Sequence, residues 1–325
     1  QRTKVNTSFS TWSELLCGVP QGSVLGPLLF NIYLNDMFLQ LADTNVCNFA
    51  EDATIYSFSS SNEKALELLL NDTHKTLNWF RINSMVANPG KFQIMFLGSK
   101  INNNNISLII ENKYIKCKNE VTLLGIDIDE KLTFTNHIKN LCDKANNRLR
   151  ALTRIRRFLS IEQTKYLSEA YIMSTFKYCP LIWMFCNKTA NDLINNVHKR
   201  SLRLTYDMED VDFEDLLTQD KSCTVHQSNL RTLILEIYKS IYHLNPPIMW
   251  EFFKEKQITY DLRNKNLLKL PPTKSSRYGS NTLSFKGSLL WNTLPSEYKC
   301  VTEYEKFKKM IKIWDPTTCS CKICK

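Results

Sequence analysis

The sequence has little of what flexible, membrane-spanning or secreted chains need. Only eight of its 325 residues are glycine, so long flexible linkers are not expected. The longest apolar run lies near Tyr178–Cys186 and is far shorter than the ~20 residues that cross a bilayer. The first residues show no signal-peptide pattern. With 43% apolar and 23% charged residues, the composition is that of a globular protein, and we expect no membrane partner.

The cysteines show no paired framework, because they are scattered and number eleven. We expect five of them, which lie in apolar surroundings, to be small core residues: Cys17, Cys47, Cys142, Cys179 and Cys186. Scattered free thiols favour a reduced, intracellular protein, in the nucleus or the cytoplasm. Because the chain begins with Gln1 rather than Met, we also expect it to be cut from something longer.

Acidic residues are scarce in one part of the chain. Residues 131–206 hold 14 Lys and Arg against 4 Asp and Glu, whereas the remaining residues balance. The net charge of +10 therefore comes from this stretch. Such a local surplus indicates a polyanion as partner. A solvated helix surface that binds nothing is the alternative.

The front of the chain, to about residue 130, mixes helices and strands. Residues 24–34 and the stretch Leu66–Phe80 have helical periodicity, and Ser59–Asn62 is expected to cap the second helix. The expected strands are Val46–Phe49, Ala53–Phe58, Phe92–Leu97, Ser107–Ile110, Tyr114–Cys117 and Val121–Ile128.

From about residue 134 the period is helical. Four apolar stripes follow one another until Asn245-Pro246-Pro247, and a last helix is expected from Thr302 to Ile313. We therefore predict an α+β chain in three parts, 1–130, 131–245 and 246–325.

The most distinctive stretch is a glycine- and proline-rich loop that leads into an apolar helix: Cys17-Gly18-Val19-Pro20-Gln21-Gly22-Ser23-Val24-Leu25-Gly26-Pro27-Leu28-Leu29-Phe30. Its glycines let the backbone approach a ligand, and exposed amides near a helix start suit a phosphate. From the residues alone, an ordinary tight turn is the favoured interpretation.

A pair of adjacent acids, Glu51-Asp52, follows between two apolar strands. Two carboxylates on one turn repel each other unless a cation lies there. Hard oxygen ligands suit Mg²⁺, and two metals held by carboxylates promote phosphoryl transfer. For an isolated pair, two solvated acids on a surface hairpin are the favoured interpretation.

Position and order change both interpretations, because the two stretches resemble reverse transcriptases (RNA-directed DNA polymerases) of non-LTR retrotransposons. Cys17–Phe30 is similar, almost letter for letter, to the second conserved polymerase motif of that family. Phe49-Ala50-Glu51-Asp52 matches its motif of an aromatic residue, Ala and two aspartates, except at Glu51. The resemblance implies two-metal nucleotidyl transfer in the intact family enzyme, with Mg²⁺ at Glu51 and Asp52.

Further roles follow from the same resemblance. Pro20, Gln21 and Gly22 are implied to line the pocket for nucleotide and template. Asn88-Pro89-Gly90-Lys91-Phe92 looks like the next motif, which makes Lys91 a third catalytic candidate beside the triphosphate. Leu124 and Gly125 lie in a stretch that resembles the hairpin gripping the primer end.

The resemblance also implies the architecture and the partners. Residues 1–130 are expected to form a partial polymerase palm, an antiparallel sheet with helices, followed by a mostly helical thumb over 131–245 and a C-terminal region of unknown role over 246–325. The partners are an RNA template and a DNA primer, with no small-molecule cofactor beyond deoxynucleotides. The thumb residues expected on the template–primer backbone are Arg148, Arg154, Arg156, Arg157, Lys199, Arg200 and Arg203.

Two departures from the family pattern weaken the catalytic expectation. Glu51 is one methylene longer than the aspartate it replaces, and a shift of about 1 Å in a positioned site costs about a hundredfold. The family's other metal-holding aspartate lies upstream of Arg2–Leu16, outside this sequence. We therefore expect a C-terminal fragment without polymerase activity of its own. A non-catalytic nucleic-acid-binding remnant and a decayed copy that does not fold stably are the alternatives.

The tail resembles the same elements' C-terminal region at Tyr278-Gly279, Leu290–Pro295 and Phe307-Lys308, without any chemistry assigned. It ends with Cys319, Cys321 and Cys324. Three thiols at this spacing fit part of a zinc site that Cys300 or a histidine completes. A complete paired set of Cys and His is missing from the sequence, so a frayed, reduced tail is expected.

Overall fold

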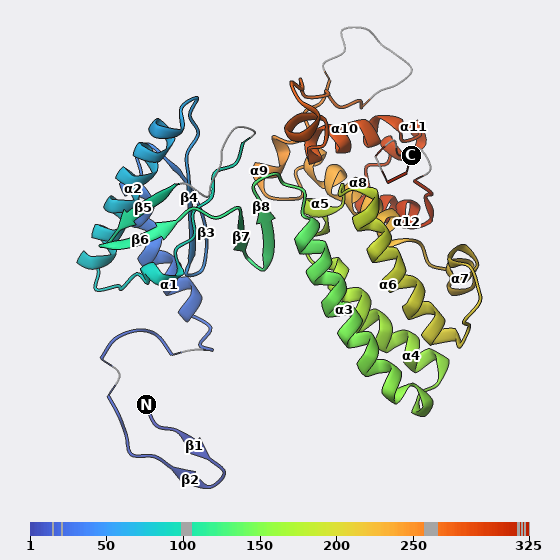
Figure 1. Ribbon diagram of the computed structural model, residues 1–325, viewed down its shortest axis with the longest axis horizontal. Helices are drawn as coiled ribbons and strands as arrows, with labels where there is room; N and C mark the ends of the chain where they lie inside the picture. The colour runs from blue at the N-terminus through green and yellow to red at the C-terminus, as the bar shows by residue number, and fades with distance from the viewer. Residues whose placement is uncertain are drawn as a thin grey trace. The chain divides into compact units, whose positions relative to one another are not determined.

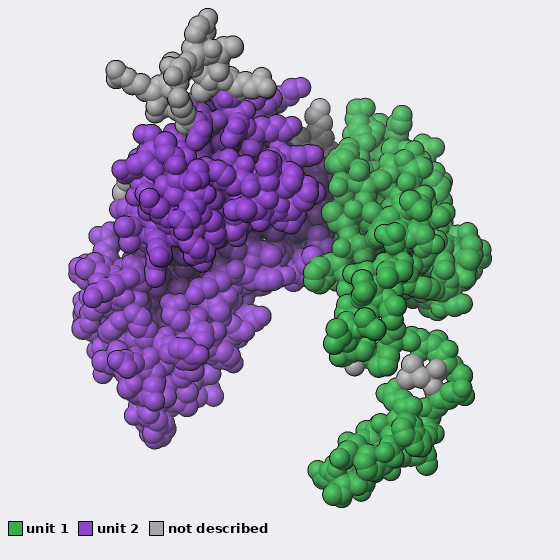
Figure 2. Space-filling model, turned by 180° about the vertical axis from the view of Figure 1, so that it is seen from behind, with its two compact units in different colours: residues 1–94, 102–118 green, residues 95–101, 119–325 purple. Residues whose placement is uncertain are grey.

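A computed structural model describes residues 1–14, 16–20, 22–98, 106–256, 266–316, 319, 321 and 323–324. The chain forms two compact units (Figure 2), which we call the first unit (residues 1–94 and 102–118) and the second unit (residues 95–101 and 119–325). Helices combine with two-stranded antiparallel sheets, so the described structure is α+β. None of the described helices has both the length and the apolar character of a bilayer span.

The first unit is organised around a long helix, α2 (Asn62–Ile82), seen beside the β5–β6 hairpin in Figure 1. Ser61 caps this helix, because its hydroxyl accepts a hydrogen bond from the Lys64 N–H. Leu77 of α2 packs on one core and Trp79 on another. The other elements of this unit are β1 (Lys4–Val5), β2 (Ser8–Phe9), α1 (Gly26–Leu34), η1 (Asn35–Gln40), β3 (Asn45–Phe49), β4 (Asp52–Tyr56), η2 (Pro89–Lys91), β5 (Ser107–Ile110) and β6 (Lys113–Lys116).

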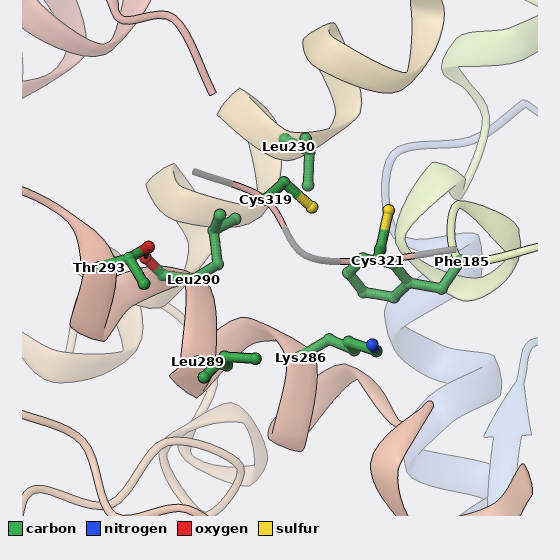
Figure 3. Close-up of a pocket in the computed structure, with 8 residues that line it drawn as sticks. All are labelled: Phe185, Leu230, Lys286, Leu289, Leu290, Thr293, Cys319 and Cys321. Atoms are coloured by element: carbon green, nitrogen blue, oxygen red, sulfur yellow. Dashed lines mark hydrogen bonds between the residues drawn. The ribbon is translucent and has the colours of Figure 1, made fainter. Parts of the chain in front are cut away.

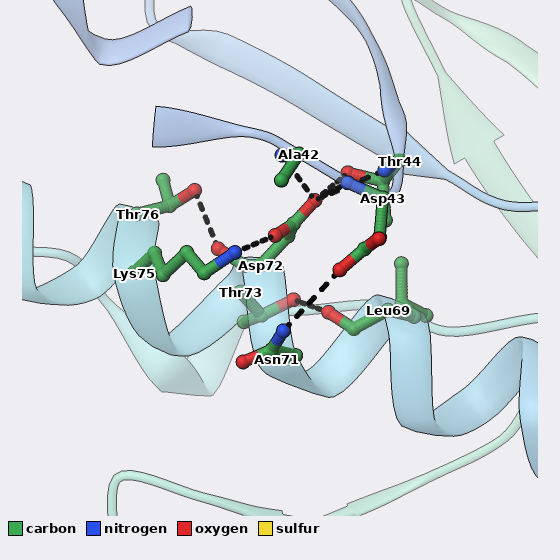
Figure 4. Close-up of polar contacts among 9 residues, drawn as sticks. All are labelled: Ala42, Asp43, Thr44, Leu69, Asn71, Asp72, Thr73, Lys75 and Thr76. Carbon is green, nitrogen blue, oxygen red and sulfur yellow. Dashed lines mark hydrogen bonds and ion pairs between the residues drawn. The ribbon is translucent and has the colours of Figure 1, made fainter. Parts of the chain in front are cut away.

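One buried carboxylate fixes the segment that leads into β3 (Figure 4). Asp72 of α2 is fully buried, and its Oδ2 accepts hydrogen bonds from the backbone N–H groups of Ala42, Asp43 and Thr44 at 3.1, 2.9 and 3.0 Å. The Lys75 ammonium lies 2.8 Å from Oδ1. Burial alone would raise the pKa of Asp72, but these hydrogen bonds outweigh it and lower the pKa from 3.8 to about 2. The carboxylate therefore stays ionised and anchors the strand that carries the acidic hairpin.

Replacing Asp72 with asparagine is expected to lower the free energy of unfolding of the first unit by about 2 kcal/mol. A pKa depressed in the folded state stabilises the protein above about pH 4, and this contribution disappears as the pH falls from about 4 to 2. Urea unfolding followed across this pH range tests the prediction. The stability of the Asp72→Asn variant should depend less on pH there, and identical profiles for the two proteins would contradict the assignment.

The second unit is mostly helical, with one hairpin at its start. Its first core holds residues of α3, α6 and the segment between them, and a second core joins α8 to the C-terminal helices. Its elements are β7 (Glu120–Leu123), β8 (Ile126–Asp129), α3 (Thr135–Ile155), η4 (Arg156–Phe158), α4 (Ile161–Leu167), η5 (Ser168–Ile172), η6 (Met173–Lys177), α5 (Pro180–Trp183), α6 (Lys188–Tyr206), α7 (Phe213–Asp220), α8 (Val225–Ile241), α9 (Pro247–Trp250), η7 (Ser276–Ser280), α10 (Leu283–Thr293), α11 (Ser296–Lys299) and α12 (Tyr304–Ile313).

The tail stretch Leu290–Pro295 contributes to the second core of this unit. Trp291 is 1% exposed, and its indole N–H donates to the Asn266 carbonyl at 2.9 Å. The Asn292 amide makes a pair of hydrogen bonds with the Leu268 backbone, at 2.8 and 2.9 Å. Phe307 of α12 is fully buried in the same core. Trp291, Asn292 and Phe307 therefore stabilise the second core, and the role of the C-terminal region stays unassigned.

Most of the expected elements are confirmed, but two expected strands are wrong and one helix was missed. Val121–Ile128 is not one strand, because Leu124 and Gly125 turn the chain between β7 and β8. Phe92–Leu97 was expected as a strand but makes only a single parallel bridge, between Ile94 and Cys117. Its apolar residues pack beside α2, and this burial needs no continuous ladder. Helix α10 was missed, because Gly287 and Ser288 stand on its buried side where apolar residues would mark the period.

The burial expected of five cysteines is confirmed only in part, and all eleven cysteines are free. Cys142 and Cys186 are buried as expected, but Cys17, Cys47 and Cys179 are exposed. On a two-stranded hairpin, side chains alternate between two sides, so apolar neighbours in sequence do not show that a residue is buried. Along β3, for example, Val46 and Asn48 are half-buried while Cys47 points to the other side.

Candidate functional site

The acidic pair lies at the tip of the β3–β4 hairpin, as the sequence predicted. Phe49 pairs with Asp52, so Ala50 and Glu51 form a two-residue turn and Asp52 begins β4. Ala50 has a left-handed backbone (φ 51°), and the Asn48 side chain donates to its carbonyl at 2.9 Å. The side chains of Glu51 and Asp52 are both exposed.

Within the described residues, no hydrogen bond or ion pair reaches the carboxylate of Glu51 or Asp52. No third carboxylate, thiol or imidazole of those residues joins them in a ligand group. Mg²⁺ prefers near-octahedral oxygen coordination, and a two-metal centre needs more carboxylate ligands than two. The described acids therefore do not make a complete metal site.

The glycine- and proline-rich loop before α1 is exposed, and two of its glycines have a left-handed backbone. Gly18 and Gly22 have φ of 81° and 82°, a region that glycine adopts without strain. Ser23 closes the loop onto α1, because its hydroxyl accepts from the Gly26 N–H at 3.1 Å. Pro20 and Gly22 are exposed, and Gln21 lies outside the described residues. The family resemblance also predicts that this loop faces Glu51 and Asp52, and this stays a prediction.

Lys91 lies on a short capped turn, η2. The Asn88 side chain accepts from the Gly90 N–H at 3.0 Å, and the Lys91 N–H donates to the Asn88 carbonyl at 3.0 Å. Phe92 packs on the α2 core directly after it. The turn is thus anchored on one side while the Lys91 side chain remains exposed.

Leu124 and Gly125 form the turn of a tight hairpin in the second unit. Leu123 pairs with Ile126, and both turn residues have positive φ, 49° and 78°, as in a type I′ turn. The Tyr178 hydroxyl donates to the Leu124 carbonyl at 2.7 Å. The Leu124 side chain is 41% exposed, so a bulky apolar group is held at the tip despite an unfavourable backbone.

The start of α3 holds this hairpin in place. The Asn140 amide donates to the Asp127 carboxylate at 2.9 Å, and the Asp127 N–H donates to Nδ1 of His137 at 3.3 Å. Burial lowers the pKa of His137, which keeps the ring neutral and Nδ1 free to accept. Burial alone would raise the pKa of Asp127, but hydrogen bonds from Asn140 and Thr122 outweigh it and lower the pKa.

The basic residues expected on the thumb fall into two groups. Arg154, Arg157 and Arg200 are exposed, and Lys199 is half-buried on α6. Arg148, Arg156 and Arg203 use guanidinium donors within the unit. Arg156 bonds the carbonyls of Leu204, Leu159 and Thr205, at 2.9, 2.9 and 3.1 Å, so it braces η4 against the end of α6.

The other two braced arginines are similar. Arg148 donates to the Tyr171 carbonyl and to the Thr175 hydroxyl, both at 2.8 Å, and Arg203 donates to the Val211 carbonyl at 3.2 Å. These three side chains have fewer donors left for a phosphate than the exposed ones.

Comparison with known proteins decides the family of the front of the chain. Residues 3–128 match the family described as reverse transcriptase (RNA-dependent DNA polymerase). Similar proteins include the retrovirus-related Pol polyprotein from type-1 retrotransposable element R1 2 of Nasonia vitripennis, 26% identical over 51% of this chain and 43% of the relative. Residues 3–128 are a reverse transcriptase segment of the non-LTR retrotransposon kind.

Two further relatives of this reverse transcriptase segment come from Drosophila melanogaster. The probable RNA-directed DNA polymerase from transposon BS is 26% identical over 63% of this chain and 24% of the relative. The corresponding protein from transposon X-element is 26% identical over 55% and 20%. The chain thus spans less than half the length of the curated relatives it matches. No solved structure matches it.

Sequence reasoning missed two clusters of functional side chains. Asp72 lies within an amphipathic helix, and nothing local marks it as the anchor of residues 42–44. His226 lies in α8, yet its ring nitrogen is 3.3 Å from the Cys321 sulfur, 95 residues further along the chain. The cysteine spacing of the tail fitted part of a zinc site, but a frayed tail was expected instead, and only the fold identifies His226 as the fourth member.

Replacing Leu124 with asparagine separates the two roles of the hairpin tip. Asn-Gly is the preferred type I′ pair, so Leu124→Asn is expected to raise the free energy of unfolding of the second unit by about 1 kcal/mol. If the leucine side chain contacts the primer end, the same variant binds a primer–template duplex less tightly. Thermal melts and duplex titrations measure the two effects, and unchanged affinity in a stabilised variant would exclude the primer contact.

Proposed function

We propose that the second unit binds the sugar–phosphate backbone of an RNA template paired with a DNA primer, and that it acts as the thumb beside a palm formed within residues 1–130. In the intact family enzyme the primer 3′-hydroxyl attacks the α-phosphate of a deoxynucleotide. The chain of 325 residues by itself is proposed to bind the duplex without extending it. The region 246–325 packs onto this thumb as part of its core.

One observation carries the proposal, a row of cations along the outward side of α3. Lys139, Arg150, Arg154 and Arg157 are all exposed, and Arg157 lies in η4, two residues after the end of α3. At 100° per residue the first three lie within a third of the helix circumference, opposite the buried side. Asp143 is the only acid among residues 135–157.

The length of this row suits a duplex. Lys139 and Arg154 are 15 residues apart, which corresponds to about 22 Å along a helix. That distance covers roughly six base pairs of duplex at about 3.4 Å each. Contacts of this kind position a nucleic acid without selecting a sequence, as an enzyme that copies any template requires.

Helix α6 extends the same surface. The Arg200 guanidinium donates to the Asn146 side chain of α3 at 2.9 Å, so its charge lies at the junction of the two helices. Hydrogen bonding to a neutral amide keeps the full positive charge available. Arg154, Arg157, Lys199 and Arg200 are therefore the strongest of the expected contacts, together with Lys139 and Arg150.

Removing two charges from the α3 row tests the binding surface. The double variant Arg154→Gln, Arg157→Gln is expected to bind an RNA–DNA duplex about ten-fold less tightly at low salt, because two exposed ion contacts are lost. The matched control is Lys309→Gln, Lys312→Gln on α12, which removes two exposed charges from the same unit. Equal weakening by both pairs would show that only net charge matters and would contradict the assigned surface.

A primer-extension assay tests the catalytic half of the proposal. With Mg²⁺ or Mn²⁺, the purified chain is expected to give no template-dependent synthesis. Glu51→Asp is expected not to restore synthesis, since the described residues place only two carboxylates at the tip of the β3–β4 hairpin. Asp52→Asn serves as control for a contaminating polymerase. Synthesis that Asp52→Asn abolishes would overturn the claim that the chain lacks polymerase activity. The duplex-binding claim is tested separately by the titration of the Arg154→Gln, Arg157→Gln variant.

A further inference from the structure

Four side chains from two distant segments converge in the second unit. His226 of α8 and the tail residues Cys319, Cys321 and Cys324 place one ring nitrogen and three sulfurs within 4.8 Å of one another. The Cys321 sulfur lies 3.3 Å from Nε2 of His226 and 3.6 Å from the Cys324 sulfur. This is the only group of three or more such ligands among the residues that the structure describes.

The spacing fits a tetrahedral metal centre. Zinc–sulfur bonds of about 2.3 Å and zinc–nitrogen bonds of about 2.0 Å place neighbouring ligand atoms roughly 3.5–3.8 Å apart. The separations of 3.3 and 3.6 Å lie within a few tenths of an ångström of that range. Three sulfurs and one imidazole nitrogen are a donor set that selects zinc, and a closed set of four is typical of a structural site.

The surroundings are those of an interior site. His226 is 4% and Cys321 is 2% exposed, so the expectation of a frayed tail is wrong for this part of the chain. Cys319 and Cys321 line a small pocket with Leu230, Leu290 and Lys286 (Figure 3). Three thiolates around a divalent ion leave one negative charge, which the ammonium of Lys286 in the same pocket favours.

The local fold presents the histidine. Thr224 and Gln227 form a capping box at the start of α8, with reciprocal hydrogen bonds of 3.0 and 3.2 Å. The His226 ring lies edge-on to Phe185, with centroids 6.5 Å apart. Arg231, one turn further along α8, donates to the Trp314 carbonyl at 2.9 Å. The chain is therefore held against α8 shortly before the cysteines begin.

We propose that His226, Cys319, Cys321 and Cys324 bind one zinc ion, which ties the C-terminal tail to α8. The site is structural, since all four ligand positions come from the protein and none is left for substrate. The ion closes a loop of about a hundred residues and stabilises the second core from its edge. This function is independent of nucleic-acid binding.

Metal analysis of the full chain tests the proposal directly. Protein expressed with added zinc and purified under reducing conditions is expected to carry about one zinc per chain by native mass spectrometry and elemental analysis. Replacement by Co²⁺ is expected to give the thiolate charge-transfer band and the strong visible bands of tetrahedral coordination. Absence of zinc, a weak octahedral cobalt spectrum, or a Cys321–Cys324 disulfide in fresh protein would each overturn the proposal.

Variants then test the ligand set. Cys324→Ser changes the exposed ligand and is expected to weaken zinc retention against a competing chelator by more than the roughly 10–100-fold that outer-shell changes cost. Cys300→Ser is the matched control, because Cys300 is an exposed cysteine outside the cluster, and it should keep the zinc. Equal retention by both variants would contradict the assignment, and the wild-type cobalt spectrum decides the question if Cys324→Ser does not fold.

Discussion

The division of α3 into a buried and a charged side is the constraint on which the proposed function depends. Ile138, Ala145 and Leu149 are 0–3% exposed, because they pack in the core that α3 shares with α6. An unpaired ammonium or guanidinium is too costly to bury there, so the cations of this helix must lie on the outward side. The same packing that stabilises the second unit thus arranges its positive charges in a row. The proposed duplex binding therefore rests on the helix's amphipathic pattern and needs no separate pocket.

The first unit has smaller cores than the second unit and exposes more apolar side chains on its helix α1. Its acidic hairpin depends on Asp72, which holds residues 42–44, and on a sheet of only two described strands. Helix α1 exposes Leu28 at 55% and Ile32 at 63%. Apolar side chains one turn apart and exposed in this way are typical of a surface that packs on another element. A well-formed helical unit therefore accompanies a segment whose acidic pair lacks a complete ligand set among the described residues.

Local pattern predicted the elements well and their partners poorly. The β3–β4 hairpin and the turn at Glu51 follow from alternation and turn chemistry, which depend on neighbours in sequence. The exposure of Cys47 and the braces made by Arg156 depend on contacts that periodicity does not contain. His226 is the clearest case, because the cysteine spacing of the tail offered a zinc site only as the alternative to a frayed tail, and only the three-dimensional fold brought His226 beside the three thiols. The roles assigned to Glu51, Asp52 and Lys91 came from family resemblance, and the residues alone favoured solvated surface groups.

The salt dependence of duplex affinity is the most direct measure of the central claim. Each phosphate contact releases counterions, so the logarithm of the binding constant should fall linearly with the logarithm of salt concentration, by about 0.9 per contact. For the surface formed by α3 and α6, the account predicts a steep slope that corresponds to several contacts. A flat response in an equilibrium titration of an RNA–DNA duplex would show that the row of cations on α3 does not contact the backbone.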